Sequence, residues 1–255
     1  MSVVDVLLLG LVGVAAGAAN TIAGGGTFIA YPALIALGFP PITANITSAV
    51  GLLSGYLGGS VSYRRELLGQ GWRMRQVVPA ALIGAVTGAV LLLLTPGETF
   101  SDIVPYLVLL ACGLLVIQPR MKALVQQRNA RNGKDQSRRL SPAVHAGILL
   151  AAVYGTYFGA GLGVILLAVF GVLVVDGLQR LNGLRTAVSL LIKVIGVAIF
   201  SFSGQVAWLA VLILAPMAYL GGVLGAVISR RMSERVLRYT VISAGLGVAV
   251  VLLVS

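Results

Sequence analysis

Polar side chains recur at helical spacing within one apolar segment, LNGLRTAVSLLIKVIGVAIF. They stand at i, i+3, i+7 and i+11, so they share one stripe of an α-helix; they are Asn182, Arg185, Ser189 and Lys193. Lys193 falls near the middle of this segment, where a lysine in a bilayer costs about 2.5–3.5 kcal/mol and is expected to face a cavity, a partner or a substrate. The seven acidic residues all fall in or beside predicted loops, so a neutral amine or a diffusible anion must relieve the charge. Snorkelling towards the interface is the alternative for both cations.

Two glycine-rich stretches, NTIAGGGT and YGTYFGAGLG, are the second group of candidates. Glycine permits φ > 0 and lets backbone N–H groups converge, and a helix that begins at such a bend adds a partial positive charge. Close helix packing is the alternative role for a single glycine. We therefore predict an anion site formed by the two bends and the helices that follow them. Its candidate residues are Asn20, Thr21, Gly24, Gly25, Gly26, Asn45, Thr47, Ser48, Tyr157, Gly161, Gly163, Asn182, Arg185, Thr186, Ser189 and Lys193.

The composition indicates an integral membrane protein. Of the 255 residues, 58% are hydrophobic and 10% are charged, and the mean hydropathy is +1.02. This exceeds what a water-soluble core of the same length could bury. Most apolar runs reach the ~20 residues that a helix needs to cross the bilayer, so we predict an all-α polytopic membrane protein with about 8–10 membrane segments. The single cysteine and single histidine form no ligand cluster, so neither a metal nor another cofactor is expected.

The net charge of +11 comes mainly from basic residues in the predicted loops. Basic residues gather in three segments beside apolar runs, as the positive-inside rule predicts for cytoplasmic loops, so nucleic acid is not an expected partner. The connection 96–102, PGETFSD, carries two acids and no base, and the turn SFSGQ is uncharged, so both should face outward. The chain termini are predicted outside and the central linker inside. The basic segments are 64–75, 119–142 and 230–238.

The sequence also repeats itself at a constant offset of 137 residues. PAALIGAVTGAV from Pro79 matches PMAYLGGVLGAV from Pro216 (216 minus 79), and Gly10, Gly24, Gly26 and Asn45 match Gly147, Gly161, Gly163 and Asn182. With one residue inserted after Asn182, NITSAV also matches NGLRTAV, which aligns Gly55 with Lys193. The loop sides give matching helices opposite orientations, so we predict an inverted-topology duplication.

Each half should contain a short or broken helical hairpin, with the glycines at its bend, followed by three transmembrane helices. The predicted units are the first repeat (1–118), the basic cytoplasmic linker (119–142) and the second repeat (143–255). The predicted helices are 43–63, 76–95 and 103–118 in the first half, and 181–202, 204–229 and 236–254 in the second.

The run YPALIALGFPPITANITSAVGLLSGYLGGSVSYRREL and the second-half run ending RLNGLRTAVSLL carry a family resemblance. With the glycine cluster before it, the first run resembles the TauE/SafE family of membrane permeases, also called the 4-toluene sulfonate uptake permease family. ANITS and NGLRT stand here where the family has its usual Gly-Thr-Ser wording. The resemblance covers nearly the whole chain and implies secondary transport, by import or export, of small sulfur-containing anions such as sulfite, thiosulfate or sulfonates.

Two other classes of function stay open on the residues alone. A passive anion channel would use the same groups, and a non-transporting membrane subunit of a larger complex would use the small-residue helix faces for partners. An enzyme is not expected, because the serine-rich positions lack a histidine partner. The expected partners are a small anionic substrate and the lipid bilayer of the plasma or inner membrane, with a homo-oligomer as an open alternative.

Overall fold

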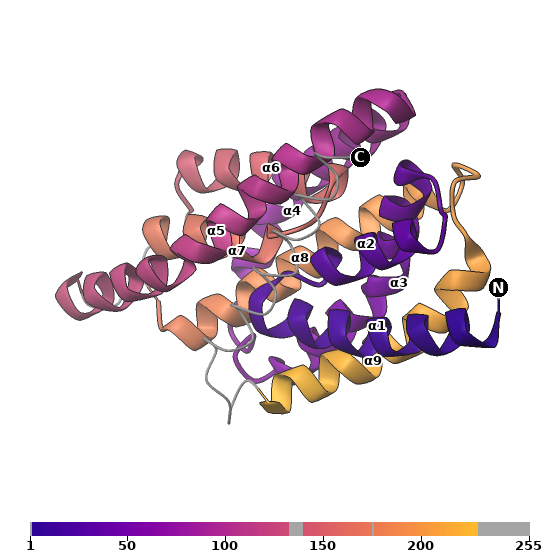
Figure 1. Ribbon diagram of the computed structural model, residues 1–255. Coiled ribbons are helices and arrows are strands. Elements are labelled where there is room, and N and C mark those ends of the chain that lie inside the picture. Colours follow the sequence, from indigo (N-terminus) through magenta and orange to yellow (C-terminus); the bar gives the residue numbers. More distant parts are fainter. Residues whose placement is uncertain (1, 133–139, 175, 229–255) are drawn as a thin grey trace.

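The computed structural model describes residues 2–132, 140–174 and 176–228. Over these residues the chain is helical, with loops and turns between the helices (Figure 1). The helices are α1 (Val3–Ala23), α2 (Thr27–Ala36), α3 (Pro41–Ser62), α4 (Gly71–Leu94), α5 (Gly97–Asn132), α6 (Pro142–Tyr157), α7 (Leu162–Leu173), α8 (Leu178–Phe200) and α9 (Trp208–Ile228). The all-α fold class is confirmed. The predicted helix 236–254 and the basic segment 230–238 lie outside the described residues.

Several helices are long and apolar enough to cross a bilayer. Five spans qualify by length and composition within the described residues: Val3–Thr21, Gly71–Leu94, Gly97–Leu114, Leu178–Phe200 and Trp208–Gly225. α2 and α7 are apolar but have only 10 and 12 residues, or about 15 and 18 Å at 1.5 Å per residue. Each is therefore about half as long as a bilayer is thick, as the prediction of a short or broken hairpin in each half allows.

The α4–α5 connection corrects one sequence expectation. The acidic stretch 96–102 was expected to be a loop, but α5 begins at Gly97, and only Thr95 and Pro96 separate the two helices. Proline before the first helical turn suits a helix start, and Glu98 in that turn is favoured by the helix dipole. At its other end α5 continues to Asn132, so the predicted linker 119–142 is helical over much of its length.

The element boundaries recur at the offset found in the sequence. α3 and α8 begin 137 residues apart (178 minus 41), and so do α4 and α9 (208 minus 71). The first arm of each hairpin packs against a helix of the other half, with α1 along α9 and α6 along α4 (Figure 1). The inverted orientation of the two halves stays a prediction, as do the unit boundaries.

Glycines make these cross-half contacts close. A Cβ at Gly17 or Gly221 would collide with the backbone of the facing helix, at Ala218 and Val14 respectively. Gly84 and Gly88 of α4 approach the backbone of α6 in the same way. Because lipid is as apolar as these side chains, helix association here gains from close van der Waals packing rather than from leaving water.

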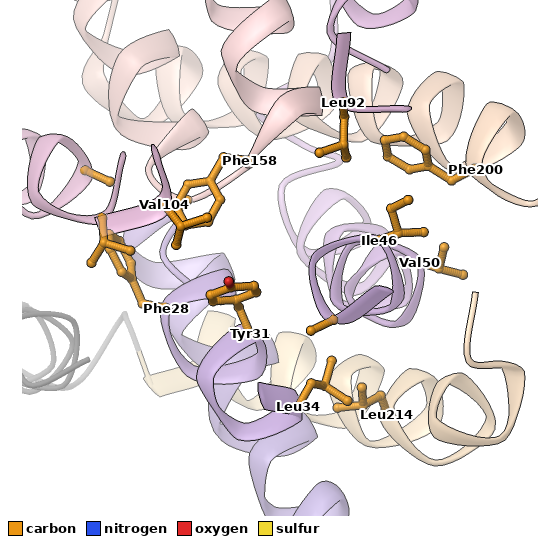
Figure 2. Close-up of a cluster of buried hydrophobic side chains, with 14 of the residues drawn as sticks. Phe28, Tyr31, Leu34, Ile46, Val50, Leu92, Val104, Phe158, Phe200 and Leu214 are labelled. Atoms are coloured by element: carbon orange, nitrogen blue, oxygen red, sulfur yellow. The ribbon is translucent and has the colours of Figure 1, made fainter. Parts of the chain in front are cut away.

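The larger hydrophobic cluster lies where α2 meets α3, α5 and α9. Figure 2 shows Tyr31 of α2 near Phe158, with Leu34 towards Leu214 of α9. The Tyr31 and Phe158 rings meet edge to face, with centroids 5.8 Å apart and planes at 78°. This cluster therefore anchors the short helix α2 and the loop after α6, which carry the two glycine-rich bends.

Two polar clasps join the halves at opposite ends of the α3–α8 pair. At one end Arg73 forms an ion pair with Asp176, which also accepts a hydrogen bond from Arg180 Nε at 3.1 Å. Gln70 donates to the Arg180 carbonyl at 2.9 Å and accepts from Arg73 at 3.0 Å. These four residues, Gln70, Arg73, Asp176 and Arg180, are called the ionic clasp.

The clasp at the other end is neutral. Thr43 Oγ1 donates to Gln205 Oε1 at 3.0 Å, and Thr47 Oγ1 accepts from the Ala207 N–H at 3.0 Å. The Thr43–Gln205 contact is the repeat mate of the hydrogen bond from Arg180 to the Leu68 carbonyl, because each partner is displaced by 137 residues (180 minus 43 and 205 minus 68). The clasps therefore follow the constant offset without an inserted residue.

The first prediction concerns the ionic clasp. Asp176→Asn is expected to lower the melting temperature of the detergent-solubilised protein, because Arg73 stays buried and loses its carboxylate. The loss in unfolding free energy should be on the order of 2 kcal/mol. Asp102→Asn changes an exposed aspartate on α5 and should leave the melting temperature unchanged. Equal melting temperatures for the two variants would contradict a stabilising clasp.

The same carboxylate gives a second prediction, on pH. Burial alone would raise the pKa of Asp176, but hydrogen bonds from Arg73, the Gly177 N–H and Arg180 hold this pKa below its ordinary value of 3.8. A carboxyl with a lowered folded-state pKa stabilises the fold above its unfolded pKa, and this contribution is lost as the pH falls through the folded pKa. Melting temperatures measured below about pH 4 should fall more steeply for the wild type than for Asp176→Asn.

Candidate functional site

The two glycine-rich bends touch each other. The Gly161 N–H donates to the Gly24 carbonyl at 3.2 Å, and a Cβ on Gly24 would lie 2.9 Å from the Gly163 Cα. Gly24 and Gly161 have φ of 76° and 78°, in the left-handed region that favours glycine. The bends are thus close enough for backbone groups of both hairpins to face one space.

Local chemistry explains why each hairpin breaks there. Gly24 ends α1 in the left-handed conformation, and its N–H returns to the Ala19 and Asn20 carbonyls. Gly161 begins α7, and its carbonyl accepts the Val164 and Ile165 N–H groups. The bends therefore satisfy part of their backbone within the chain, as membrane burial requires.

A small cavity lies beside the contact between the bends. Its lining comes from α1, α3, α7, α8 and the first bend: Asn20, Thr21, Gly24, Tyr56, Gly59, Gly163, Arg185, Thr186 and Ser189. Its volume is about 10 Å³, near the ~10–15 Å³ that one water molecule occupies on this measure. An anion larger than water would therefore require the lining to move apart.

The lining combines one cation with neutral hydrogen-bonding groups. Arg185 is 3% exposed and donates from Nη1 to the Gly163 carbonyl at 3.3 Å. Asn20 Nδ2 and Thr21 Oγ1 are buried and have no hydrogen-bond partner among the described residues. No carboxylate belongs to the lining formed by the described parts of the chain. A buried donor without a partner costs about 1–3 kcal/mol, so the cavity is suited to a ligand that accepts hydrogen bonds and carries negative charge.

The structure brings seven of the predicted site residues to this cavity: Asn20, Thr21, Gly24, Gly163, Arg185, Thr186 and Ser189. Gly161 bonds to Gly24 just beside it. Gly25 and Gly26 are buried in the first bend, where a Cβ on Gly26 would meet the Ala16 carbonyl at 2.5 Å. Asn182 accepts the Thr186 hydroxyl at its carbonyl, one turn before the cavity. The role of all these residues in anion binding stays a prediction.

Other predicted site residues gather at the carboxyl end of α6 instead. Lys193 Nζ donates to the Gly155 carbonyl at 2.8 Å, and Asn45 Nδ2 donates to the Tyr157 carbonyl at 2.8 Å. The Tyr157 hydroxyl lies 3.2 Å from Thr95 Oγ1. Ser48 bonds to the Asn45 carbonyl, and Thr47 belongs to the neutral clasp. Lys193 and Arg185 therefore share a helix stripe but have different surroundings.

Sequence reasoning left two lining residues out of the site, Tyr56 and Gly59. The Tyr56 hydroxyl lies near the Asn20 carboxamide, without a hydrogen bond between them, and in the field of Arg185. A signal for Tyr56 was present, because the constant offset pairs it with Lys193 (193 minus 56). The alignment with one residue inserted after Asn182 had instead paired Gly55 with Lys193. For Gly59 the sequence shows only its place in a small-residue run.

A third prediction tests the contact between the bends. Gly24→Ala forces a side chain into the left-handed region, at about 1–2 kcal/mol, and also pushes its Cβ into the Gly163 backbone. Gly38→Ala is the matched control, because Gly38 has φ +85° but nothing within 4 Å of its Cβ position. Thermal unfolding in detergent should show a larger loss for Gly24→Ala. A loss of the same size in both variants would mean that the bend contact contributes nothing.

Comparison with known proteins agrees with these features. The sequence profile of the sulfite exporter TauE/SafE family matches residues 9–252. The probable membrane transporter protein ORF9 of Sinorhizobium sp is 26% identical over 249 residues, which cover 93% of this chain and 88% of the relative. A probable membrane transporter protein of Haemophilus influenzae is 26% identical over 228 residues, covering 88% and 85%.

A third relative extends the comparison. The probable membrane transporter protein YfcA of Escherichia coli K12 is 22% identical over 240 residues, covering 92% of this chain and 86% of the relative. No solved structure gives a significant match. The match to the family profile, which spans nearly the whole chain, confirms the resemblance found in the sequence. The chain belongs to the sulfite exporter TauE/SafE family of membrane proteins.

Proposed function

We propose that the protein is a secondary transporter of small sulfur-containing anions, such as sulfite, thiosulfate or sulfonates, and that the cavity at the two bends is its substrate site. The observation that carries the proposal is the buried Arg185 guanidinium facing a cavity whose Asn20 and Thr21 polar atoms have no partner among the described residues. The family match and the relatives named as membrane transporters support transport as the activity.

The chemistry of the lining suits an oxyanion. A guanidinium presents N–H donors in a planar fork that fits the oxygens of tetrahedral anions, and a water-poor site strengthens each such bond. Thr21 and Ser189 add hydroxyl groups beside Arg185, while the Thr186 hydroxyl donates to the Asn182 carbonyl. Gly24 and Gly163 add backbone without side chains, so a ligand is able to approach the bends closely.

The small volume of the cavity supports alternating access as the mechanism. A channel needs a continuous path, whereas this cavity has room for about one water molecule and lies between two clasped ends. Opening the ionic clasp would admit the anion from one end, and opening the neutral clasp from the other. Rocking of one half against the other about a central site is the usual form of such a cycle in repeat-built transporters.

The topology of the proposal follows the loop charges. Arg64 and Arg65 lie beside the ionic clasp, so this end is assigned to the cytoplasm by the positive-inside rule. The neutral clasp then faces outward, as do the chain termini, in a plasma or inner membrane. The partners are the small anion and the bilayer, and a homo-oligomer is compatible with the exposed apolar faces of α4 and α9.

The test is a substrate panel in proteoliposomes, and it gives the fourth prediction. Sulfite, thiosulfate and methanesulfonate should show counterflow, in which unlabelled anion inside drives uptake of labelled anion. Arg185→Gln should reduce this flux by about 10–100-fold, because a charge-assisted contact is worth about 1.5–3 kcal/mol. Arg185→Lys keeps the charge without the fork and should retain part of the flux.

The control is Arg75→Gln, which removes an exposed cation from α4 and should leave the flux unchanged. Unchanged flux in Arg185→Gln would contradict this site. Steady conductance in a planar bilayer without counterflow would indicate a passive anion channel instead. No flux from folded wild-type protein for any of the three anions would indicate a non-transporting subunit.

A further inference from the structure

The carboxyl end of α6 holds a built-in cation. Lys193 is 4% exposed, and its Nζ donates to the Gly155 carbonyl at 2.8 Å. Gly159 lies so close to Nζ that a side chain there would collide with it. The neighbouring Tyr157 carbonyl accepts from Asn45 Nδ2. The carboxyl end of this helix therefore holds a buried ammonium group through the Gly155 carbonyl.

Such a helix end is a natural cation site. The last carbonyls of a helix carry about half a negative charge, and half-helix ends in repeat-built transporters coordinate coupling cations. Here the Lys193 ammonium occupies the position that a free cation would take. Unlike a metal ion, it is able to become neutral by releasing one proton, and the carbonyls would then lose their positive partner.

The surroundings leave this ammonium without a counter-charge. Within the described part of the chain, the Gly155 carbonyl is the polar contact of Nζ, and no carboxylate contacts it. The nearest cation on its own helix is Arg185, about 12 Å along the axis. Described titratable or charged groups on the elements packed against α8 are Tyr56 of α3, Arg73 and Arg75 of α4, His145, Tyr154 and Tyr157 of α6, and Glu98, Asp102, Tyr106, Cys112 and Arg120 of α5.

Four of these groups have other partners. Arg73 pairs with Asp176 in the ionic clasp, and His145 lies at the opposite end of α6, beside the Ser141 carbonyl. Tyr154 donates to the Leu107 carbonyl, and Tyr157 bonds to Thr95. Protonation of Lys193 therefore depends on the carbonyl end of α6 and on whatever charge enters the protein.

A short path of hydrogen bonds and backbone connects Lys193 to the cavity. Lys193 holds Gly155 and lies against Gly159, Gly161 follows two residues later, and the Gly161 N–H bonds to Gly24 in the cavity wall. The constant offset of 137 residues also relates Lys193 to the cavity. It pairs Lys193 with Tyr56, and Tyr56 lines the cavity. One half of the repeat thus provides a wall of the anion cavity where the other half holds a cation.

We propose that Lys193 is the proton-coupling residue of transport. The ammonium form holds the second bend against the first while an anion occupies the cavity. After the anion leaves, the N–H bond of the ammonium breaks heterolytically, the proton passes to water on the open side, and the amine keeps the electron pair. Reloading reverses the step, so one proton travels with each monovalent anion. This inference rests on the proposed function, because it requires the protein to move anions.

The experiment uses methanesulfonate, whose charge is fixed because it is the anion of a strong acid. Any proton that moves with it must therefore be carried by the protein. Proteoliposomes of the full chain are assayed in two ways: counterflow at equal pH on both sides, and accumulation driven by a pH gradient with the membrane potential clamped at zero. The variants are Lys193→Gln, Lys193→Arg and the exposed-cation control Arg75→Gln.

Wild type and Arg75→Gln should show both counterflow and accumulation. Lys193→Gln keeps a donor for the Gly155 carbonyl but has no proton to release, so it should retain counterflow and lose accumulation. Lys193→Arg keeps a permanent cation at the helix end and should behave in the same way. Both Lys193 variants should also keep the wild-type melting temperature in detergent. If Lys193 only stabilised the end of α6, its replacement would not remove accumulation while leaving counterflow and the melting temperature unchanged.

Three results would overturn the proposal. The first is accumulation by Lys193→Gln at the wild-type level. The second is loss of both fluxes in folded Lys193→Gln and Lys193→Arg, which would make Lys193 a structural or anion-binding residue. The third is wild-type counterflow without accumulation. This result would show that transport is not coupled to protons, and it does not depend on whether Lys193→Gln folds. Absence of wild-type counterflow, by contrast, would remove the proposed function itself.

Discussion

The hydrogen bond from the Gly161 N–H to the Gly24 carbonyl is the contact on which the rest of the structure depends. A helix that breaks inside a bilayer leaves backbone groups without partners, and lipid offers none. Here two breaks meet, so each buries the backbone of the other away from lipid. Two broken helices are tolerated together where either one alone would be costly, and the space beside their contact is the candidate site.

Close packing of glycines keeps the two breaks in register. Gly17 and Gly221 bring α1 and α9 together, and Gly84 and Gly88 do the same for α4 and α6. Each of these pairs joins a hairpin arm of one half to a helix of the other, so the halves hold each other's hairpins in place. These glycine-lined faces are held together by van der Waals packing rather than by strong polar bonds, so they resist relative movement of the halves only weakly. The two clasps supply polar contacts between the halves, one at either end of the α3–α8 pair.

The two predicted halves begin matching helices at one constant offset but differ in the chemistry of their side chains. The first half contributes Asn20 and Thr21, whose Nδ2 and Oγ1 atoms have no partner among the described residues, whereas the second contributes the buried cations Arg185 and Lys193. The clasps differ in the same way, since one contains an ion pair and its mate only neutral groups. The proposed transport cycle needs such differences, because identical halves would open equally well at both ends.

Much of the fold was predictable, because it depends on local pattern. Apolar length predicts spanning helices, and three adjacent glycines predict a break within such a segment. Boundaries were less predictable: the acids of 96–102 suggested a loop, yet Glu98 is also favourable in the first turn of a helix. Charge alone does not distinguish an outer loop from a helix start.

The candidate site, too, was predictable from the sequence only in part. Helical spacing by itself determined that Arg185, Ser189 and Lys193 share one stripe of α8, and the offset of 137 residues predicted that the two bends correspond. Only the tertiary structure decided that the stripe serves two places, with Arg185 at the cavity and Lys193 on the carboxyl end of α6. Eight residues of helix separate the two cations by about 12 Å, and which neighbour each one meets depends on how other helices cross that stripe. Local sequence carries no record of those crossings.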